Sequence, residues 1–218
     1  MLSDLKFALR QLTNSPGFTL VVLVILALGI GAATAMFTVV NSVLLRPVDY
    51  PDSERLCVIR ETKLPEFPQF SVSPANYLDF AKETDAFAGA YATTGTTFNL
   101  TGGAEPVRVS GQRATGQFFE VLRVPPMLGR GFGPAEDVPG KDQVVVLLHA
   151  FWQRQFGGRA SIINESIMLN GTAYTVIGVM PPSFRRGTSL DVIVPMAFAA
   201  DEAAGRGGHY LSMVLLKP

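Results

Sequence analysis

The chain has 218 residues, and its eighteen basic residues balance eighteen acidic ones. Because the net charge is zero, no basic field attracts nucleic acid, and we expect no nucleic-acid partner. The single cysteine, Cys57, excludes an intrachain disulfide and a thiolate metal cage, and two histidines are too few for a metal site built from several of them. The strand-like setting of Cys57 is typical of a small core residue.

The chain opens with a predicted amphipathic helix over residues 1–17. Four leucines between Leu2 and Leu12 recur at three- and four-residue spacing, whereas Lys6 and Arg10 lie on another face. The segment ends in Asn-Ser-Pro-Gly, a cluster that breaks helices and lets the chain turn. Because an apolar stretch follows directly, we expect this helix to lie in the membrane interface, in contact with lipid.

Residues 18–45 form the predicted transmembrane helix, because they contain no charged side chain. A helix of this length rises about 42 Å, whereas the hydrocarbon core of a bilayer is about 30 Å thick. Lys6 and Arg10 precede this stretch, and acidic residues predominate after Arg46. The positive-inside rule therefore places the N-terminus in the cytoplasm and the rest of the chain on the other side.

Small residues recur within the predicted transmembrane helix. Gly29 and Ala33 are four positions apart, and so are Gly31 and Ala35. This spacing lets the backbones of two membrane helices approach closely. These four residues are therefore candidates for contact with a second helix.

A secretory signal peptide is the alternative interpretation of the same stretch. Residues Ala33 to Ala35 have the Ala-x-Ala form of a cleavage site, and cleavage there would release a soluble protein. However, the apolar run continues through Leu45, and seventeen residues precede it rather than a short basic tip. These features favour the membrane anchor.

Residues 46–218 are long enough for one domain with a substantial core. A helix is expected over 75–87, because Ser73 and Pro74 supply a cap and a proline at the first turn, and it is expected to bury Tyr77 and Phe80. The other elements follow from apolar periodicity. Strands are expected at 55–62, 106–114, 143–148 and 191–195 and, as two short strands, within 88–100, and helices at 116–122 and 150–156.

The clearest local pattern is a β-hairpin over residues 166–180. Two β-rich segments flank Asn170 and Gly171, a pair that tolerates the positive φ angles of a type I′ turn. Beyond residue 195 the pattern is weak, and we expect an irregular tail. Strands interleaved with short helices predict an α+β fold, in which the transmembrane helix is followed by a mixed α/β domain of one lobe or two.

We identify no catalytic, cofactor-binding or metal-ligating residue in the sequence. His149 is expected at the end of a strand and His209 in a glycine-rich turn, and neither has a second ligand at motif spacing. The adjacent acids Glu136 and Asp137 lie in a loop, where carboxylates are ordinarily solvated. The glycine-rich stretch 129–133 lacks the strand-to-helix context and the Gly-Lys-Ser/Thr ending of a phosphate-binding loop. We therefore expect neither an enzyme nor a cofactor site.

The sequence from Leu5 to Pro51 resembles the start of MacB/FtsX-like permeases of ABC transporters, in the branch whose permease chain has no fused ATPase. The resemblance rests on the long aliphatic run, the Ala-Leu-Gly-Ile-Gly element at 27–31 and the Leu-Leu-Arg-Pro exit at 44–47. The region after the predicted transmembrane helix, residues 46–218, resembles the MacB-type periplasmic core domain. Its matching motifs occur in the order of that family at 118–122, 128–130, 136–137, 151–158, 169–171 and 176–181.

The sequence departs from the family in two places. Asn164, Glu165 and Ser166 stand where a Gly-Arg-Thr-like turn is expected before the hairpin. In addition, the family continues beyond residue 218 through the rest of the outer region and three more spans. The expected organisation is therefore an interfacial helix at 1–17, a transmembrane helix at 18–45 and a periplasmic core domain, truncated relative to the family, at 46–218.

The resemblance implies the N-terminal part of an ABC permease in the cell inner membrane, with the main domain in the periplasm. The implied role is ATP-driven export or mechanotransmission. The implied partners are membrane lipid, a cytoplasmic ABC ATPase and a second permease chain in a homodimer or a pair, and ATP acts only through the ATPase. The alternative is a membrane-anchored periplasmic binding or sensor module without transport activity. A periplasmic hydrolase is a third hypothesis, which requires a convergent serine, histidine and acid.

Overall fold

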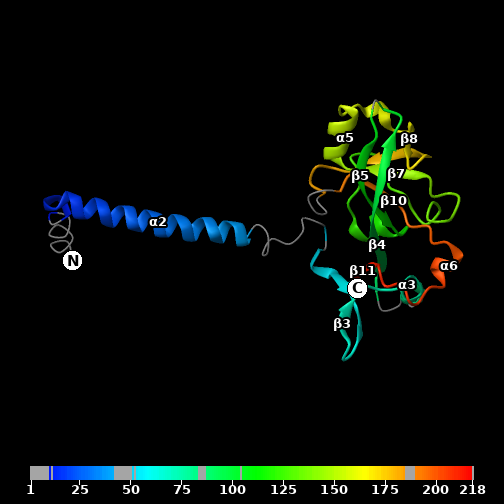
Figure 1. The fold of residues 1–218 in the computed structure, drawn as a ribbon, viewed down its shortest axis with the longest axis horizontal. Coiled ribbons are helices and arrows are strands. Elements are labelled where there is room, and N and C mark those ends of the chain that lie inside the picture. Colours follow the sequence, from blue (N-terminus) through cyan, green and yellow to red (C-terminus); the bar gives the residue numbers. More distant parts are fainter. Residues whose placement is uncertain are drawn as a thin grey trace. The chain divides into compact units, whose positions relative to one another are not determined.

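The structure is a computed structural model, and it describes residues 10, 12–41, 51, 53–82, 87–103, 105–184 and 190–217. They belong to two units, Met1–Pro47 and Val48–Pro218, which we describe separately. Figure 1 shows the long helix of the first unit and the sheet of the second. Most of the amphipathic helix predicted over 1–17 lies outside the described residues, although 12–14 are helical.

The first unit contains one long apolar helix, α2 (Pro16–Val40). Pro16 stands in its first turn, where a missing backbone N–H costs no hydrogen bond, so the helix begins inside the Asn-Ser-Pro-Gly cluster, two residues before the predicted span. The helix is about 37 Å long, and it is long and apolar enough to cross a membrane. Residues 42–45 of the predicted span lie outside the described residues.

The second unit is built on a mixed sheet, which has nine strands among the described residues. Its main path runs β1-β11-β4-β5-β10-β7-β9-β6, and β8 pairs with both β4 and β9. The pairs β5–β10 and β7–β9 are parallel, and the others are antiparallel. The strands are β1 (Leu56–Ile59), β4 (Gly89–Thr101), β5 (Val107–Ala114), β6 (Leu128–Gly129), β7 (Val144–Leu147), β8 (Ser166–Leu169), β9 (Thr172–Val179), β10 (Val192–Pro195) and β11 (Ser212–Leu216).

Short helices and a small separate hairpin accompany the sheet. The hairpin pairs β2 (Glu61–Lys63) with β3 (Phe67–Phe70) and projects from the body of the domain (Figure 1). The helices are α3 (Pro74–Lys82), α4 (Phe118–Leu122), α5 (His149–Phe156) and α6 (Ala200–Ala203), together with the 3-10 helices η2 (Ser53–Arg55) and η4 (Ala160–Ile162).

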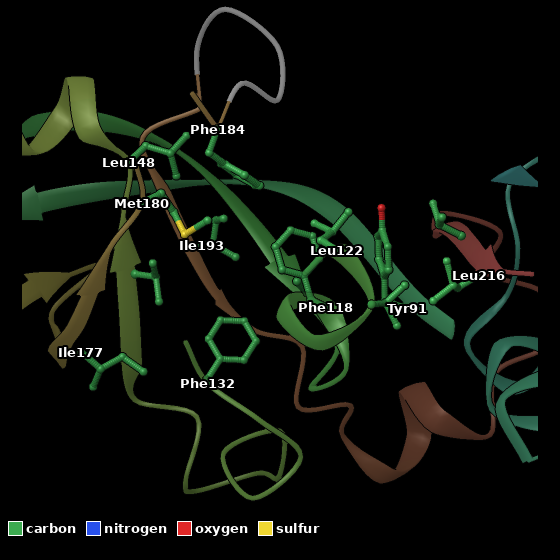
Figure 2. Close-up of a cluster of buried hydrophobic side chains, with 14 residues drawn as sticks. Tyr91, Phe118, Leu122, Phe132, Leu148, Ile177, Met180, Phe184, Ile193 and Leu216 are labelled. Carbon is green, nitrogen blue, oxygen red and sulfur yellow. The ribbon is translucent and has the colours of Figure 1, made fainter. Parts of the chain in front are cut away.

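Both faces of the central strands are buried. In β7, Val145 and Leu147 belong to one apolar cluster, whereas Val146 belongs to another. Because successive side chains of a strand point to opposite faces, the two clusters lie on opposite sides of the sheet. Burial on both sides explains the unbroken apolar run that predicted this strand. Figure 2 shows the cluster to which Val146 belongs, in which the rings of Tyr91 and Phe118 meet edge to face at 5.1 Å.

Two predictions about the strands are wrong. The segment expected to form two short strands is the single strand β4, which is thirteen residues long. Its polar and glycine-containing middle is held extended because β5 pairs with it along most of its length. The predicted irregular tail contains β11, which lies inside the sheet between β1 and β4. Its successive residues Met213 and Val214 enter different apolar clusters, so β11 is a core strand.

Several smaller expectations are corrected as well. Helix α3 ends at Lys82, and residue 87 is not helical. Tyr77 is buried as predicted, but the side chain of Phe80 is 42% exposed. His149 is the first residue of α5 rather than the end of a strand. Cys57 is only half-buried, because it lies on β1. Of the two alternatives left open for the domain, one lobe or two, the structure has one, because the second unit is a single compact body.

The strand expected over 55–62 is divided between β1 and β2, which belong to different sheets, and the other local predictions are confirmed. Strand β5 alternates as expected, α4 falls within its predicted range, and α5 begins one residue before its own. Helix α5 ends at Gly157, whose φ of 63° makes it a left-handed cap. The hairpin of β8 and β9 turns at Asn170 and Gly171, which have φ angles of 52° and 79°. The turn is therefore of the type that the Asn-Gly pair predicts.

Candidate functional site

Helix α2 is the first candidate for a functional surface. Gly29, Gly31, Ala33 and Ala35 are all exposed, and a Cβ added at either glycine would meet no atom within 4 Å. An α-helix turns about 100° per residue, so Gly31 points about 200° away from Gly29. The four small residues therefore form two narrow faces on opposite sides of α2, one with Gly29 and Ala33 and the other with Gly31 and Ala35.

The other side chains of α2 suit an apolar medium. None of its residues is buried within the described chain. The hydroxyl groups in its second half are satisfied by its own backbone, because Thr34 donates to the carbonyl oxygen of Ile30 at 2.7 Å and Thr38 donates to that of Thr34 at 2.8 Å. A bilayer tolerates a helix whose polar groups are all bonded internally. The exposed apolar surface of α2 therefore needs lipid or other helices around it.

Strand β1 is where the chain from α2 enters the sheet. Among the strands that the structure describes, β1 pairs with β11 alone, and Leu56 lies opposite Leu216. The guanidinium of Arg55 donates to the carbonyl oxygen of Lys217 from Nε at 3.1 Å and from Nη2 at 2.5 Å. The backbone N–H of Lys217 donates back to the carbonyl oxygen of Arg55 at 3.0 Å. The first and last described strands of the sheet are therefore joined side by side.

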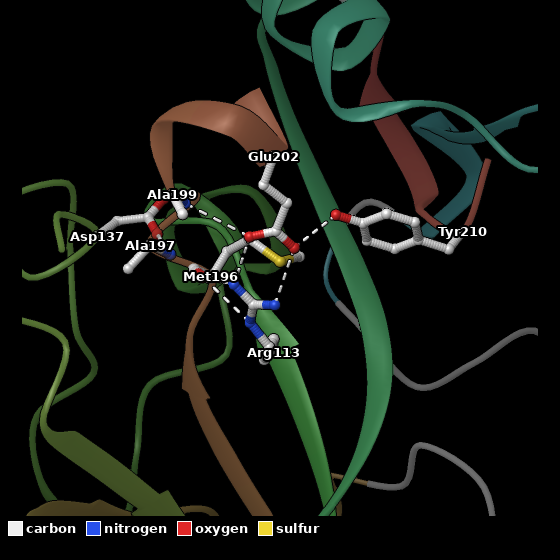
Figure 3. A network of polar contacts seen from close by, with 7 residues as sticks. All are labelled: Arg113, Asp137, Met196, Ala197, Ala199, Glu202 and Tyr210. Carbon is white, nitrogen blue, oxygen red and sulfur yellow. Dashed lines mark hydrogen bonds and ion pairs between the residues drawn. The ribbon is translucent and has the colours of Figure 1, made fainter. Parts of the chain in front are cut away.

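A second polar cluster ties the end of β10 to β5 and to the segment before β11. We call it the Arg113 brace, and it consists of Arg113, Glu202 and Tyr210 (Figure 3). The guanidinium of Arg113 donates to both carboxylate oxygens of Glu202, at 3.1 and 3.2 Å, and to the carbonyl oxygen of Met196. The hydroxyl of Tyr210 donates to Glu202 at 2.6 Å. The brace thus joins β5 to the end of β10 and to the segment before β11, both of which are distant from β5 in the sequence.

The surroundings fix the protonation states within the brace. Burial acts to raise the pKa of Glu202, but the hydrogen bonds from Arg113 and Tyr210 outweigh it, so this pKa lies below its ordinary value. Burial and the hydrogen bond to Glu202 raise the pKa of Tyr210 to about 12. Near neutral pH the brace is therefore a carboxylate held by one cation and one neutral hydroxyl, which is a structural arrangement.

The loop acids are also structural. The carboxylate of Asp137 accepts from the backbone N–H groups of Gly116 at 2.8 Å and Ala197 at 2.6 Å. The carboxylate of Glu136 accepts from the backbone N–H of Gly133 at 2.9 Å and pairs with Arg130 at 2.7 Å. The bond from Gly133, followed by the contacts with Arg130, lowers the pKa of Glu136 despite its partial burial. Both carboxylates hold the loop in place.

The glycines of the 129–133 loop serve close packing. A Cβ at Gly129 would overlap the carbonyl oxygen of Ile177, and a Cβ at Gly178 would overlap that of Arg130. Strands β6 and β9 therefore approach each other so closely that neither position accepts a side chain. A Cβ added at Gly131 would likewise lie only 2.7 Å from the ring of Phe119. This loop is a packing element rather than a phosphate cradle.

A shallow groove lies between α3 and α4. It consists of two hollows of about 460 and 440 Å³, which share Ala81 and Gln117. Two buried hydroxyl groups lie in its lining, and that of Tyr77 donates to that of Thr115 at 3.0 Å. Burial raises the pKa of Tyr77 to about 12, so this hydroxyl stays neutral at physiological pH. The groove offers a surface for contacts but no activated nucleophile.

The histidines do not assemble a reactive centre. His149 packs edge to face against Trp152 at 5.6 Å, and Nδ1 of His209 lies 3.0 Å from Glu61. No group of three histidine, cysteine, aspartate or glutamate side chains within the described residues is arranged to hold a metal ion. The hydrolase hypothesis therefore gains no support from the described part of the chain.

A family model described as the MacB-like periplasmic core domain matches residues 19–218. The chain belongs to this family. The match covers most of α2 as well as the sheet domain, so the helix and the domain belong to one family unit. A MacB-like periplasmic domain of this kind is a component of ABC transporter permeases. No curated protein matches the chain.

Three solved structures share the fold. The first is a domain of a putative permease protein from Porphyromonas gingivalis, with 18% identity, a TM-score of 0.58, and coverage of 78% of this chain and 76% of that chain. The second is the periplasmic region of MacB from Actinobacillus actinomycetemcomitans, with 18% identity, a TM-score of 0.52, and coverage of 74% and 73%. The third is the extracellular domain of the noncanonic ABC-type transporter YknZ from Gram-positive bacteria, with 16% identity, a TM-score of 0.50, and coverage of 68% and 81%.

Sequence reasoning missed the Arg113 brace and the junction of β1 with β11. The three residues of the brace lie at positions 113, 202 and 210, and no short motif connects them. Strand β11 had a detectable pattern, because Met213 to Leu216 form an unbroken apolar run. The four candidates on α2, by contrast, are exposed as a helix contact requires, although they form two faces.

Proposed function

We propose that the chain is the membrane-anchored N-terminal part of a MacB-like ABC permease and acts in ATP-driven export or mechanotransmission. One observation carries the proposal, because a single family match covers both the apolar helix and the sheet domain. An exposed apolar helix joined to a periplasmic-type domain fits an inner-membrane protein. The proposed orientation, with the N-terminus in the cytoplasm, rests on the charges that flank the helix.

Motion of α2 would enter the domain through β1. Between α2 and β1, η2 is the one helix among the described residues. Displacement of α2 would therefore pull on Ser53 to Leu56. Strand β1 is held by β11 and by the bonds between Arg55 and Lys217. Strand β11 in turn pairs with β4, which contacts β5 and β8. This series of paired strands supports a role in passing movement from the membrane to the periplasmic domain.

The proposed partners are a cytoplasmic ABC ATPase and a second permease chain. The two small-residue faces of α2 would allow two different helices to approach at once, one on each side. ATP would act through the ATPase, since the proposal gives this chain no nucleotide site. The proposed protein is therefore a transport component that performs no chemistry of its own.

The test is extraction of the tagged full chain from its native membrane in mild detergent, followed by intact-mass analysis of the chain and its partners. Copurification of an ABC ATPase with a chain that is not cleaved after Ala35 is the expected result. A matched control replaces residues 16–40 with an unrelated single-span helix, and it should lose the ATPase. A stable uncleaved chain that brings down no ATPase would favour the binding or sensor module, and a mass beginning at Met36 would overturn the anchor.

A further inference from the structure

The outer edge of β1 is an open strand edge in the described part of the chain. Strand β1 pairs with β11 on one side, and no other described strand lies on its second side. The backbone N–H of Lys217 donates to the carbonyl oxygen of Arg55, so the backbone groups of Arg55, and of Cys57 two residues later, face β11. Those of Leu56 and Val58 therefore face outward, where they can pair with a further strand.

This edge lacks the features that usually keep sheet edges apart. Exposed edges are normally short, or they carry charges, proline or a bulge. The other end of the main sheet is β6, which is only two residues long. Strand β1 has the sequence Leu-Cys-Val-Ile, without charge or proline, and it pairs with β11 in continuous register. Because the side chain of Val58 is also 62% exposed, an apolar surface and an open backbone edge occur together.

The charges beside β1 match those of a second copy of the same strand. Glu54 lies three residues before Cys57 and Arg60 three residues after it, and both are exposed. In an antiparallel pair with a two-fold axis at Cys57, Glu54 of each copy therefore lies opposite Arg60 of the other. A register shifted by one residue would instead set Arg55 opposite Arg60. Opposite charges across a strand pair are favourable and like charges are not, so the sequence selects the first register.

We infer that β1 is a contact between two copies of this chain, in which the two strands pair edge to edge around a two-fold axis at Cys57. The outward-facing backbone groups of Leu56 on one copy then meet those of Val58 on the other, and the same contact repeats across the axis. Each exposed Val58 side chain gains an apolar neighbour. The two Cys57 residues face each other as a non-hydrogen-bonded pair, in which the Cα atoms lie about 4.5 Å apart.

A four-residue strand edge is a small contact. A stable protein interface buries about 800 Å² on each partner, so pairing of β1 depends on something that already holds two chains together. The inference therefore rests on the proposed function, in which two permease chains share one membrane. Two domains attached to paired chains meet at a high effective concentration. The contact lies within the sheet domain alone, so it requires no fixed arrangement of α2 and the sheet.

Disulfide crosslinking of the native Cys57 tests the inference. Native membranes that contain the full chain are oxidised with copper phenanthroline, and the covalent dimer is measured on non-reducing gels. A dimer through Cys57 is the expected result, because a disulfide joins Cα atoms about 4.4–6.8 Å apart. No dimer through Cys57 would overturn the contact.

The matched control is Val58→Cys in the Cys57→Ala background. Val58 is exposed and Cys57 only half-buried, so random collision would favour crosslinking at position 58. The two-fold axis at Cys57 instead sets the two thiols at position 58 two strand positions apart, and several-fold less dimer is expected there. As much dimer at position 58 as at Cys57 would overturn the proposed register.

A charge exchange tests the register independently. Arg60→Glu should lower the crosslinking of Cys57 several-fold, because it sets two carboxylates opposite each other at Glu54. Addition of Glu54→Arg restores opposite charges across the axis and should restore the dimer. An unchanged yield in the single variant, or no recovery in the double variant, would contradict the pairing of Glu54 with Arg60.

Crosslinking through Ala35→Cys on α2, in the Cys57→Ala background, separates this inference from the proposed function. A dimer through position 35 without one through Cys57 would overturn the contact of β1 and leave the pair of permease chains standing. No dimer through either position would overturn the contact and would also count against the proposed second chain.

Discussion

Arg55 and Lys217 hold the two ends of the sheet domain together. Arg55 precedes the first strand and Lys217 follows the last described one, yet they exchange hydrogen bonds in both directions at the same edge of the sheet. A pull on the chain from the membrane helix therefore meets β1, β11 and this side-chain clamp together. The proposed movement of α2 would therefore load the contact between Arg55 and Lys217 first.

We expect Arg55→Ala to lower the free energy of unfolding of the domain by about 1–2 kcal/mol, because it removes two hydrogen bonds from a charged donor. The measurement is denaturant unfolding of the full chain in detergent. Arg108→Ala is the matched control, since Arg108 is exposed on β5 and loses no such bond. Equal unfolding midpoints for the two variants would show that the clamp does not stabilise the junction.

We expect Gly178→Ala to destabilise the domain by about 1–3 kcal/mol, because the added methyl group would overlap the carbonyl oxygen of Arg130 and push β6 away from β9. Gly95→Ala is the matched control, because a Cβ on this glycine of β4 meets no atom within 4 Å. Its effect should be small or stabilising. Thermal unfolding distinguishes the two, and a loss at position 95 as large as that at 178 would refute the packing explanation.

The sequence predicts those elements whose sequence signal lies within a short segment. The Asn170-Gly171 turn and the Gly157 cap depend on backbone angles that few residues tolerate, so a pair or a single residue was sufficient. Strand β7 was predicted because burial on both faces leaves a continuous apolar run. In each case the sequence pattern that reveals the element lies within about ten residues.

The rest depends on partners that are distant in sequence. The polar middle of β4 is extended only because β5 pairs with it, and β11 belongs to the sheet only because β1 and β4 lie on either side. Arg113 and Glu202 are 89 positions apart, so neither residue indicates the other. Sequence periodicity contains no information on such pairings, and the family resemblance supplied the architecture instead.

We expect the Arg113 brace to make the domain sensitive to acid. The folded-state pKa of Glu202 is lowered, so its stabilisation is fully present above the unfolded value of about 4.3 and is lost as the pH falls through the folded pKa. Glu202→Gln should therefore cost about 1–2 kcal/mol at pH 7, and its difference from the unaltered chain should shrink as the pH is lowered. Unfolding free energies measured at about pH 7, 4 and 3 check this, because the loss occurs below the unfolded pKa.

A matched control separates the brace from general acid effects. Glu120→Gln changes an exposed carboxyl on α4 that is outside the brace. Glu136 also has a lowered pKa, but it is present in every variant and cancels from the comparison. A difference between Glu202→Gln and the unaltered chain that stays constant from about pH 7 to pH 3 would contradict the assignment.

The two faces of α2 predict a specific pattern of helix association. Leucine at Gly31 would fill the narrow face that Gly31 and Ala35 form and should weaken contact there, whereas Gly29→Leu should affect only the opposite face. Disulfide crosslinking in native membranes through Ala35→Cys, in the Cys57→Ala background, reports the Gly31 face. We expect crosslinking to fall several-fold in Gly31→Leu and to remain in Gly29→Leu. Ile30→Leu preserves side-chain volume between the faces and is the control, and unchanged crosslinking in Gly31→Leu would show that this face is not an interface.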